Sequence, residues 1–139
     1  MPRAAVWELV SDPYGLPRWW PRATRVENVD GDPGATGSQW TTVLQTAEGR
    51  GVRADYRCAE SAPDERYAWE QQVSGTPFER HLRRSGLDIR LVSRGHATEV
   101  ALSATQTLRG LSRLGSPLMR RGQAALLDEA LDGIERALT

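Results

Sequence analysis

Along the middle of the chain, apolar and polar residues alternate with the period of two that is typical of half-buried β-strands. The alternation is clearest in residues 52–58, where one face carries Val52, Ala54, Tyr56 and Cys58. Further strands are predicted at residues 26–30, 38–46, 67–73, 78–94 and 98–108, with a bulge at Ser85-Gly86. Short turns rich in glycine and proline separate these segments, so they predict an antiparallel meander of about six strands with one buried face.

Helical patterns occur at the two ends of the chain. A short helix around Val6 is expected to end before Pro13, because proline disfavours helical geometry in the residue that precedes it. A second short helix should end at Pro21. From Met119 to Leu138, apolar residues recur every three or four positions, which predicts a long amphipathic helix that covers the sheet. A glycine and a proline within residues 111–118 predict a kink or a separate turn before it.

Length and charge narrow the classes of protein that this chain can belong to. Its 139 residues, of which 39% are hydrophobic and 26% charged, are typical of one folded domain over residues 1–139. Eighteen basic residues, all of them arginine, balance eighteen acidic residues. Because the net charge is zero, no global field would attract nucleic acid, and nucleic acids are not expected partners.

The cysteine content and the absence of long apolar runs bear on location and metal chemistry. Cys58 is the only cysteine, which excludes an internal disulfide and a thiolate metal cluster. The first residues do not resemble a signal peptide, and no run of about 18 apolar residues occurs. We therefore expect a cytoplasmic protein without integral membrane association. The chain has only two histidines, no metal site can be read from it, and no cofactor is expected.

Several segments together carry a resemblance to a known family. They are residues 6–13 with 16–21, residues 98–110, and residues 127–131. In this order they resemble the helix-grip fold of the START-like (SRPBCC) superfamily, which includes polyketide cyclase/dehydrase-like and pollen-allergen-like proteins. The resemblance implies an α+β fold, in which a curved antiparallel sheet wraps around a long C-terminal helix and two short helices come first. It also implies a largely apolar cavity between sheet and helix that holds a small hydrophobic molecule.

The start of the chain departs from the family pattern. Family members normally begin with a strand before the first helix, whereas here only five residues precede Val6. The usual first strand is therefore expected to be missing, and the strand at 98–108 should have an unpaired edge. A loop or a second copy of the chain could pair with that edge. Pairing with a second copy would form a homodimer. Whether Met1 is the true start stays open.

Residues on the inward faces are the candidates for ligand binding. Five tryptophans are a compositional excess, and each can bury on the order of 200 Å². Aromatic walls with few polar groups are typical of small-molecule sites. The alternative is that the aromatic rings only fill the core beneath the helix. The expected ligand-binding residues, on the strands and on the helix, are Trp40, Thr42, Tyr56, Cys58, Trp69, Gln71, Leu91, Gln106, Met119 and Leu126.

No motif identifies catalytic residues. His81 could act as a general base, and Arg80 or Tyr56 could assist the enolisation of a substrate. Whether residues 78–84 point inward depends on where the bulge falls. Cys58 lacks the histidine and aspartate spacing of a cysteine nucleophile, and a small buried thiol is common in protein cores.

Three functions remain open at this stage. The first is binding or transport of a small hydrophobic or aromatic molecule, such as a lipid or a polyketide, without a cofactor. The second is a cofactor-free polyketide cyclase or aromatase, whose cavity would hold a flexible chain in a reactive shape and would need few catalytic groups. The third is a protein-interaction module that uses the exposed sheet edge.

Overall fold

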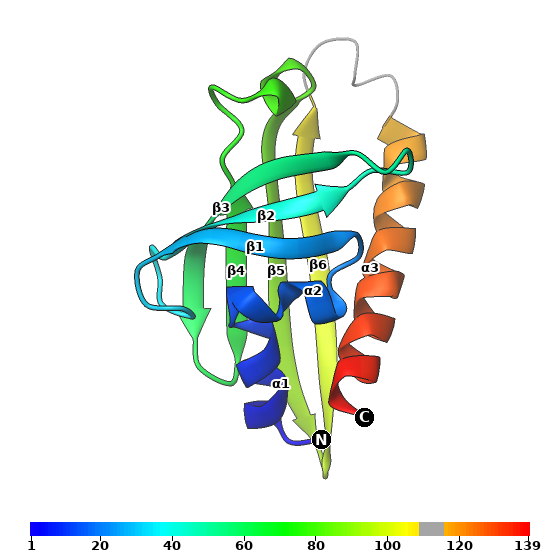
Figure 1. Ribbon diagram of the computed structural model, residues 1–139. Coiled ribbons are helices and arrows are strands. Elements are labelled where there is room, and N and C mark those ends of the chain that lie inside the picture. The colour runs from blue at the N-terminus through cyan, green and yellow to red at the C-terminus, as the bar shows by residue number, and fades with distance from the viewer. Residues whose placement is uncertain (109–115) are drawn as a thin grey trace.

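Six antiparallel strands form one sheet in their order along the chain (Figure 1). The computed structural model describes the backbone of residues 1–108 and 116–139 and the side chains of residues 1–108 and 121–139. Each strand after the first pairs with the one before it, which confirms the predicted meander. The strands are β1 (Ala23–Asp30), β2 (Gln39–Gln45), β3 (Gly51–Ala62), β4 (Arg66–Gln71), β5 (Leu82–Arg94) and β6 (Ala97–Leu108).

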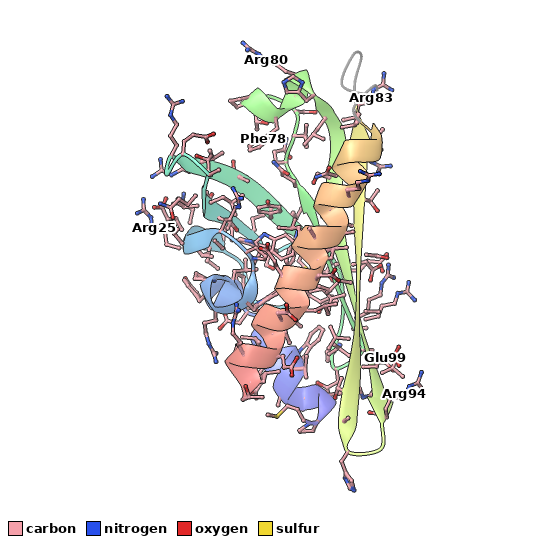
Figure 2. All side chains as sticks on the ribbon, turned by 90° about the vertical axis from the view of Figure 1, so that its right-hand side faces the viewer. Arg25, Phe78, Arg80, Arg83, Arg94 and Glu99 are labelled. Atoms are coloured by element: carbon pink, nitrogen blue, oxygen red, sulfur yellow. The ribbon has the colours of Figure 1, made fainter. Side chains whose placement is uncertain are left out.

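The sheet is strongly curved, and a long helix lies against its open side. In Figure 1, β1 and β2 run across the direction of β5 and β6, and in Figure 2 the C-terminal helix α3 crosses in front of the sheet. Two short helices at the N-terminus pack between them. This arrangement confirms the α+β helix-grip fold. The helices are α1 (Arg3–Val10), α2 (Leu16–Trp19) and α3 (Ser116–Leu138), with short 3-10 helices η1 (Pro13–Gly15) and η2 (Pro77–Arg80).

Local hydrogen bonds end α1 and begin η1 where proline was expected to break the helix. The Ser11 hydroxyl donates to the Trp7 carbonyl at 2.6 Å, on the last turn of α1. The Asp12 carboxylate then accepts a hydrogen bond from the backbone N–H of Tyr14 at 3.1 Å and caps η1. Pro13 takes the first position of η1, where its missing N–H removes no helical hydrogen bond.

The start of the fifth strand differs from the prediction. Residues 78–81 are not part of a strand, because Pro77 opens η2 and β5 begins only at Leu82. The bulge predicted at Ser85-Gly86 is also wrong: Gly86 pairs in regular register, and the shift falls between Leu82 and Arg84. Gly86 has a different role, since a Cβ there would lie 2.9 Å from the carbonyl oxygen of Trp69.

The C-terminal helix begins at Ser116, with Pro117 in its first turn. A kink or separate turn was predicted within residues 111–118. Of these, residues 116–118 belong to α3, and residues 111–115 lie outside the described part of the chain. Toward its end, α3 buries Ala130 and Ile134 against the core. Among the described residues, no helix is both long enough and apolar enough to span a bilayer.

The edge strand β6 has no further strand beside it in the described part of the chain. A groove of about 310 Å³ lies between it, α1 and the end of α3, and apolar side chains dominate its lining: Val6, Val100, Leu131, Ile134 and Leu138. Association of two copies through this edge stays a prediction.

Candidate functional site

A cluster of aromatic rings fills much of the concave face of the sheet. Trp69 on β4 is 5% exposed and lies at its centre. Its ring is 5.4–6.3 Å from five others, mostly in edge-to-face or tilted contact: Trp19, Trp20, Trp40, Tyr56 and Tyr67. Such contacts add about 0.5–1.5 kcal/mol per pair beyond the burial of apolar area. The cluster therefore joins α2 to the sheet as one packed unit.

The strand register places two candidate polar residues beside this cluster. Trp40 on β2 pairs with Tyr56 on β3, and Tyr56 pairs with Gln71 on β4, so the three side chains share one row on the concave face. Thr42 lies two residues further along β2, paired with Ala54. The structure thus brings Trp40, Thr42, Tyr56 and Gln71 together, as the period-two pattern predicts.

Several buried polar atoms in this region have no hydrogen-bond partner among the described residues. They include the Trp40 indole Nε1, the Thr42 hydroxyl and the Gln71 amide nitrogen. Trp40 and Thr42 are each only 2% exposed. An unpaired buried donor costs about 1–3 kcal/mol, so each of these groups is available to a hydrogen-bonding molecule, either water or a ligand.

Gln123 on α3 adds a polar group from the opposite side. Its amide nitrogen is buried without a partner, and the residue shares one helical stripe with Leu127, Ala130 and Ile134, which pack into the core. The stripe therefore points Gln123 at the sheet. Sequence reasoning missed this residue, although a glutamine in the apolar stripe of a helix was a signal that could have found it.

The remaining predicted ligand-binding residues have different surroundings. Cys58 is fully buried beside Trp69, and Leu91 is 4% exposed in the core. Leu126 is half-buried on α3. Gln106, which was predicted to face inward, is exposed on the edge strand β6, whereas residues of the same parity on that strand are half-buried: Val100, Leu102 and Ala104. The side chain of Met119 is outside the described part of the chain.

The catalytic candidates are separated by the structure. Arg80 ends η2 and points away from the molecule at its tip, and His81, the next residue, is also exposed (Figure 2). Tyr56 alone lies on the concave face. Burial raises the pKa of Tyr56 to about 12, so its phenol keeps its proton at neutral pH. It can donate a hydrogen bond there but cannot act as a base.

The thiol of Cys58 is poorly suited to nucleophilic chemistry. Burial raises its pKa, and its Sγ lies 3.4 Å from the carbonyl oxygen of Glu60, to which it donates. A thiol that stays protonated at neutral pH is a packing residue. Among the described side chains, no group of three or more histidine, cysteine or acidic residues could hold a metal ion.

The raised pKa of Tyr56 makes the folded chain less stable at alkaline pH. Because the pKa of Tyr56 is about 12 in the folded chain and near 10 when unfolded, the unfolded state loses its proton first, and stability falls as pH rises from 10 to 12. The difference corresponds to roughly 2–3 kcal/mol. We expect Tyr56→Phe to reduce the loss of stability over that range in urea titrations. Tyr14→Phe, at a tyrosine 62% exposed, is the control, and equal slopes in the two variants would contradict the assignment.

Comparisons with known proteins agree with this architecture. A family model described as polyketide cyclase / dehydrase and lipid transport matches residues 1–139. A Thermus thermophilus protein has a similar structure, with 18% identity and a TM-score of 0.73 over 99% of this chain and 89% of that one. An aromatase/cyclase, Zhui, from a Streptomyces species has 17% identity and a TM-score of 0.69, with the same coverage. A Rhodobacter sphaeroides protein has 16% identity and a TM-score of 0.69, over 99% and 84% of the two chains. No curated protein matches the sequence.

Proposed function

Because the chain belongs to the polyketide cyclase/dehydrase and lipid transport family, we propose that it binds one small hydrophobic or aromatic molecule between the concave face of its sheet and α3. The observation that carries this proposal is the set of buried polar atoms without a hydrogen-bond partner on the inward faces of β2 and β4 and on the core-facing stripe of α3. The aromatic cluster forms the apolar floor on which such a molecule would rest.

The types of these atoms favour a particular kind of ligand. An indole N–H can only donate a hydrogen bond, and the amide nitrogens of Gln71 and Gln123 are donors as well. The ligand should therefore carry acceptor oxygens, such as carbonyl or hydroxyl groups. Among the described residues, no charged side chain is buried. An uncharged ligand is favoured, since a buried charge without a partner is costly.

Removing one donor tests the site directly. We expect Thr42→Val to weaken binding of prodan, an uncharged naphthalene ketone, about fivefold, because one hydrogen bond contributes about 1 kcal/mol. The measurement is a fluorescence titration of the folded protein.

The matched control is Thr41→Val, the same substitution one residue earlier on β2. The Thr41 hydroxyl donates to Asp55 Oδ1 at 2.5 Å, and Asp55 lies on the outer face of the sheet. This variant should bind prodan as the unaltered chain does. Equal weakening in both variants, or no binding by the unaltered chain, would contradict the proposal. If the Thr42 variant alone is weakened, native mass spectrometry of protein from its own host would identify the natural ligand.

A cyclase acting on a polyketide-like substrate is a second candidate, supported by the position of Tyr56. Its protonated phenol lies in register between Trp40 and Gln71 and could donate a hydrogen bond to a substrate carbonyl, which polarises that carbonyl for cyclisation. Loss of cyclisation in Tyr56→Phe, with prodan binding retained, would support this candidate over simple binding. The cytoplasmic location remains a prediction.

A further inference from the structure

Arginines on the outer face and lower end of the sheet are held in ion pairs. Arg66 bonds Asp88 at 2.6 Å and also contacts Glu60, and Arg94 bonds Glu99 at 2.8 Å. The other arginines with an acidic partner within 4 Å are Arg25, Arg53, Arg57 and Arg90. The charges of these six arginines are locally balanced. Five further described arginines lack an ion pair and lie outside the end considered next: Arg3, Arg18, Arg22, Arg50 and Arg136.

Four arginines at one end of the molecule differ from these. Arg80, Arg83, Arg84 and Arg121 are exposed, and none has an ion pair within the described part of the chain. Figure 2 shows Arg80 and Arg83 at the end where α3 begins, and Arg94 with Glu99 at the opposite end. We call these four residues the arginine cluster.

The acidic residues nearest the arginine cluster are engaged elsewhere: Glu60, Glu70 and Asp88 line the same outer groove as Arg83 and Arg84, but each has another arginine within 4 Å. Along residues 79–84, the only acidic residue is Glu79, whose carboxylate accepts a hydrogen bond from the backbone N–H of Gly75 at 3.1 Å. A chain with zero net charge therefore carries a local excess of positive charge at one end. Such a local field orients a protein toward an anionic partner without attracting it as a whole.

An apolar side chain accompanies the charges. Phe78, the only phenylalanine of the chain, is half-buried on η2 and lies at the same end as Arg80 and Arg83 (Figure 2). Arginine next to an aromatic ring suits the headgroup region of a bilayer, where the guanidinium meets lipid phosphate and the ring reaches the boundary of the acyl chains.

We propose that the arginine cluster docks this protein on an anionic lipid bilayer, with Phe78 entering the headgroup region. The contact is peripheral and electrostatic, and each arginine close to such a surface strengthens binding about fivefold. The proposal rests on the charge distribution and not on the ligand site. If the ligand site is occupied by a hydrophobic molecule, the same bilayer is a source or a destination for it.

Sedimentation with vesicles tests the proposal on the full chain. The protein should bind vesicles of mixed phosphatidylcholine and phosphatidylglycerol, bind pure phosphatidylcholine far less, and lose binding as salt rises. We expect Arg83→Gln/Arg84→Gln to reduce binding roughly 25-fold, and Phe78→Ala to reduce it with little change in salt dependence. The control is Arg90→Gln/Arg94→Gln, which removes the same charge from β5 further from the cluster and should bind nearly as the unaltered chain does.

Three results would overturn the proposal. They are equal binding to both kinds of vesicle, equal loss in the two double variants, and binding to soluble polyglutamate without binding to vesicles. The last would indicate an acidic protein as the partner. Because no ligand is added, this measurement is independent of prodan binding, and either proposal can fail without the other.

Discussion

Replacing Gly133 by alanine is expected to lower the free energy of unfolding by about 3 kcal/mol, although alanine is normally the better helix former. A Cβ at this position would lie 2.3 Å from the carbonyl oxygen of Trp19 and 2.9 Å from its Cα. These are backbone atoms, which cannot rotate away as the end of a side chain can. The two helices α2 and α3 would have to separate, and α2 holds Trp19 in the aromatic cluster.

The same substitution at Gly122 provides the comparison. Gly122 lies in the same helix, and a Cβ there would have no atom within 4 Å. Gly122→Ala should therefore raise stability by about 0.5–1 kcal/mol through helix propensity alone. Urea denaturation of both variants gives opposite signs if Gly133 is required for the contact between α2 and α3. Two variants that are both more stable than the unaltered chain would refute the contact.

Side-chain periodicity predicted most of the sheet because one face is buried and the other is wet. The residues 52–58 illustrate this, since the paired strands place Tyr56 and Cys58 on the buried face as the alternation requires. The start of β5 was predicted wrongly, because Phe78 was counted as the first apolar residue of the strand. Pro77 favours a 3-10 turn instead, and the turn includes Phe78. Gly86 was wrongly interpreted as a bulge, because a glycine within a strand can mark either a bulge or a close approach of another backbone. Here it marks the close approach.

The polar part of the site was only half predictable. Alternation along the strands predicts that Thr42 and Gln71 face inward. Their lack of hydrogen-bond partners depends on which side chains pack around them, and alternation does not report this. Gln106 has the same inward parity, but it is exposed on the edge strand, and parity alone does not report how deeply a residue is covered. Gln123 lies on the core-facing stripe of α3, a position that the sequence could have shown, but its lack of a partner depends on how helix and sheet pack.

Trp69→Ala is expected to reduce the free energy of unfolding by about 3–5 kcal/mol, the range for truncating a buried aromatic residue. The substitution removes the ring that contacts five others, and leaves a cavity between α2 and the sheet. A loss of this size is a large share of the stability of an ordinary domain. Chemical denaturation with far-ultraviolet circular dichroism would measure it.

Trp7→Ala is the matched comparison, because it removes the same side chain from a peripheral position. Trp7 is half-buried on α1, and its described ring contact is with Tyr67 at 5.8 Å. We expect its truncation to cost less than half as much as that of Trp69. The difference matters for the proposed function, since a rigid cluster around Trp69 would fix the direction of the Trp40 indole, whose buried N–H has no partner among the described residues. Equal losses would mean that the rings pack without a centre, and the proposed ligand site would then lack a rigid floor to hold its donors in place.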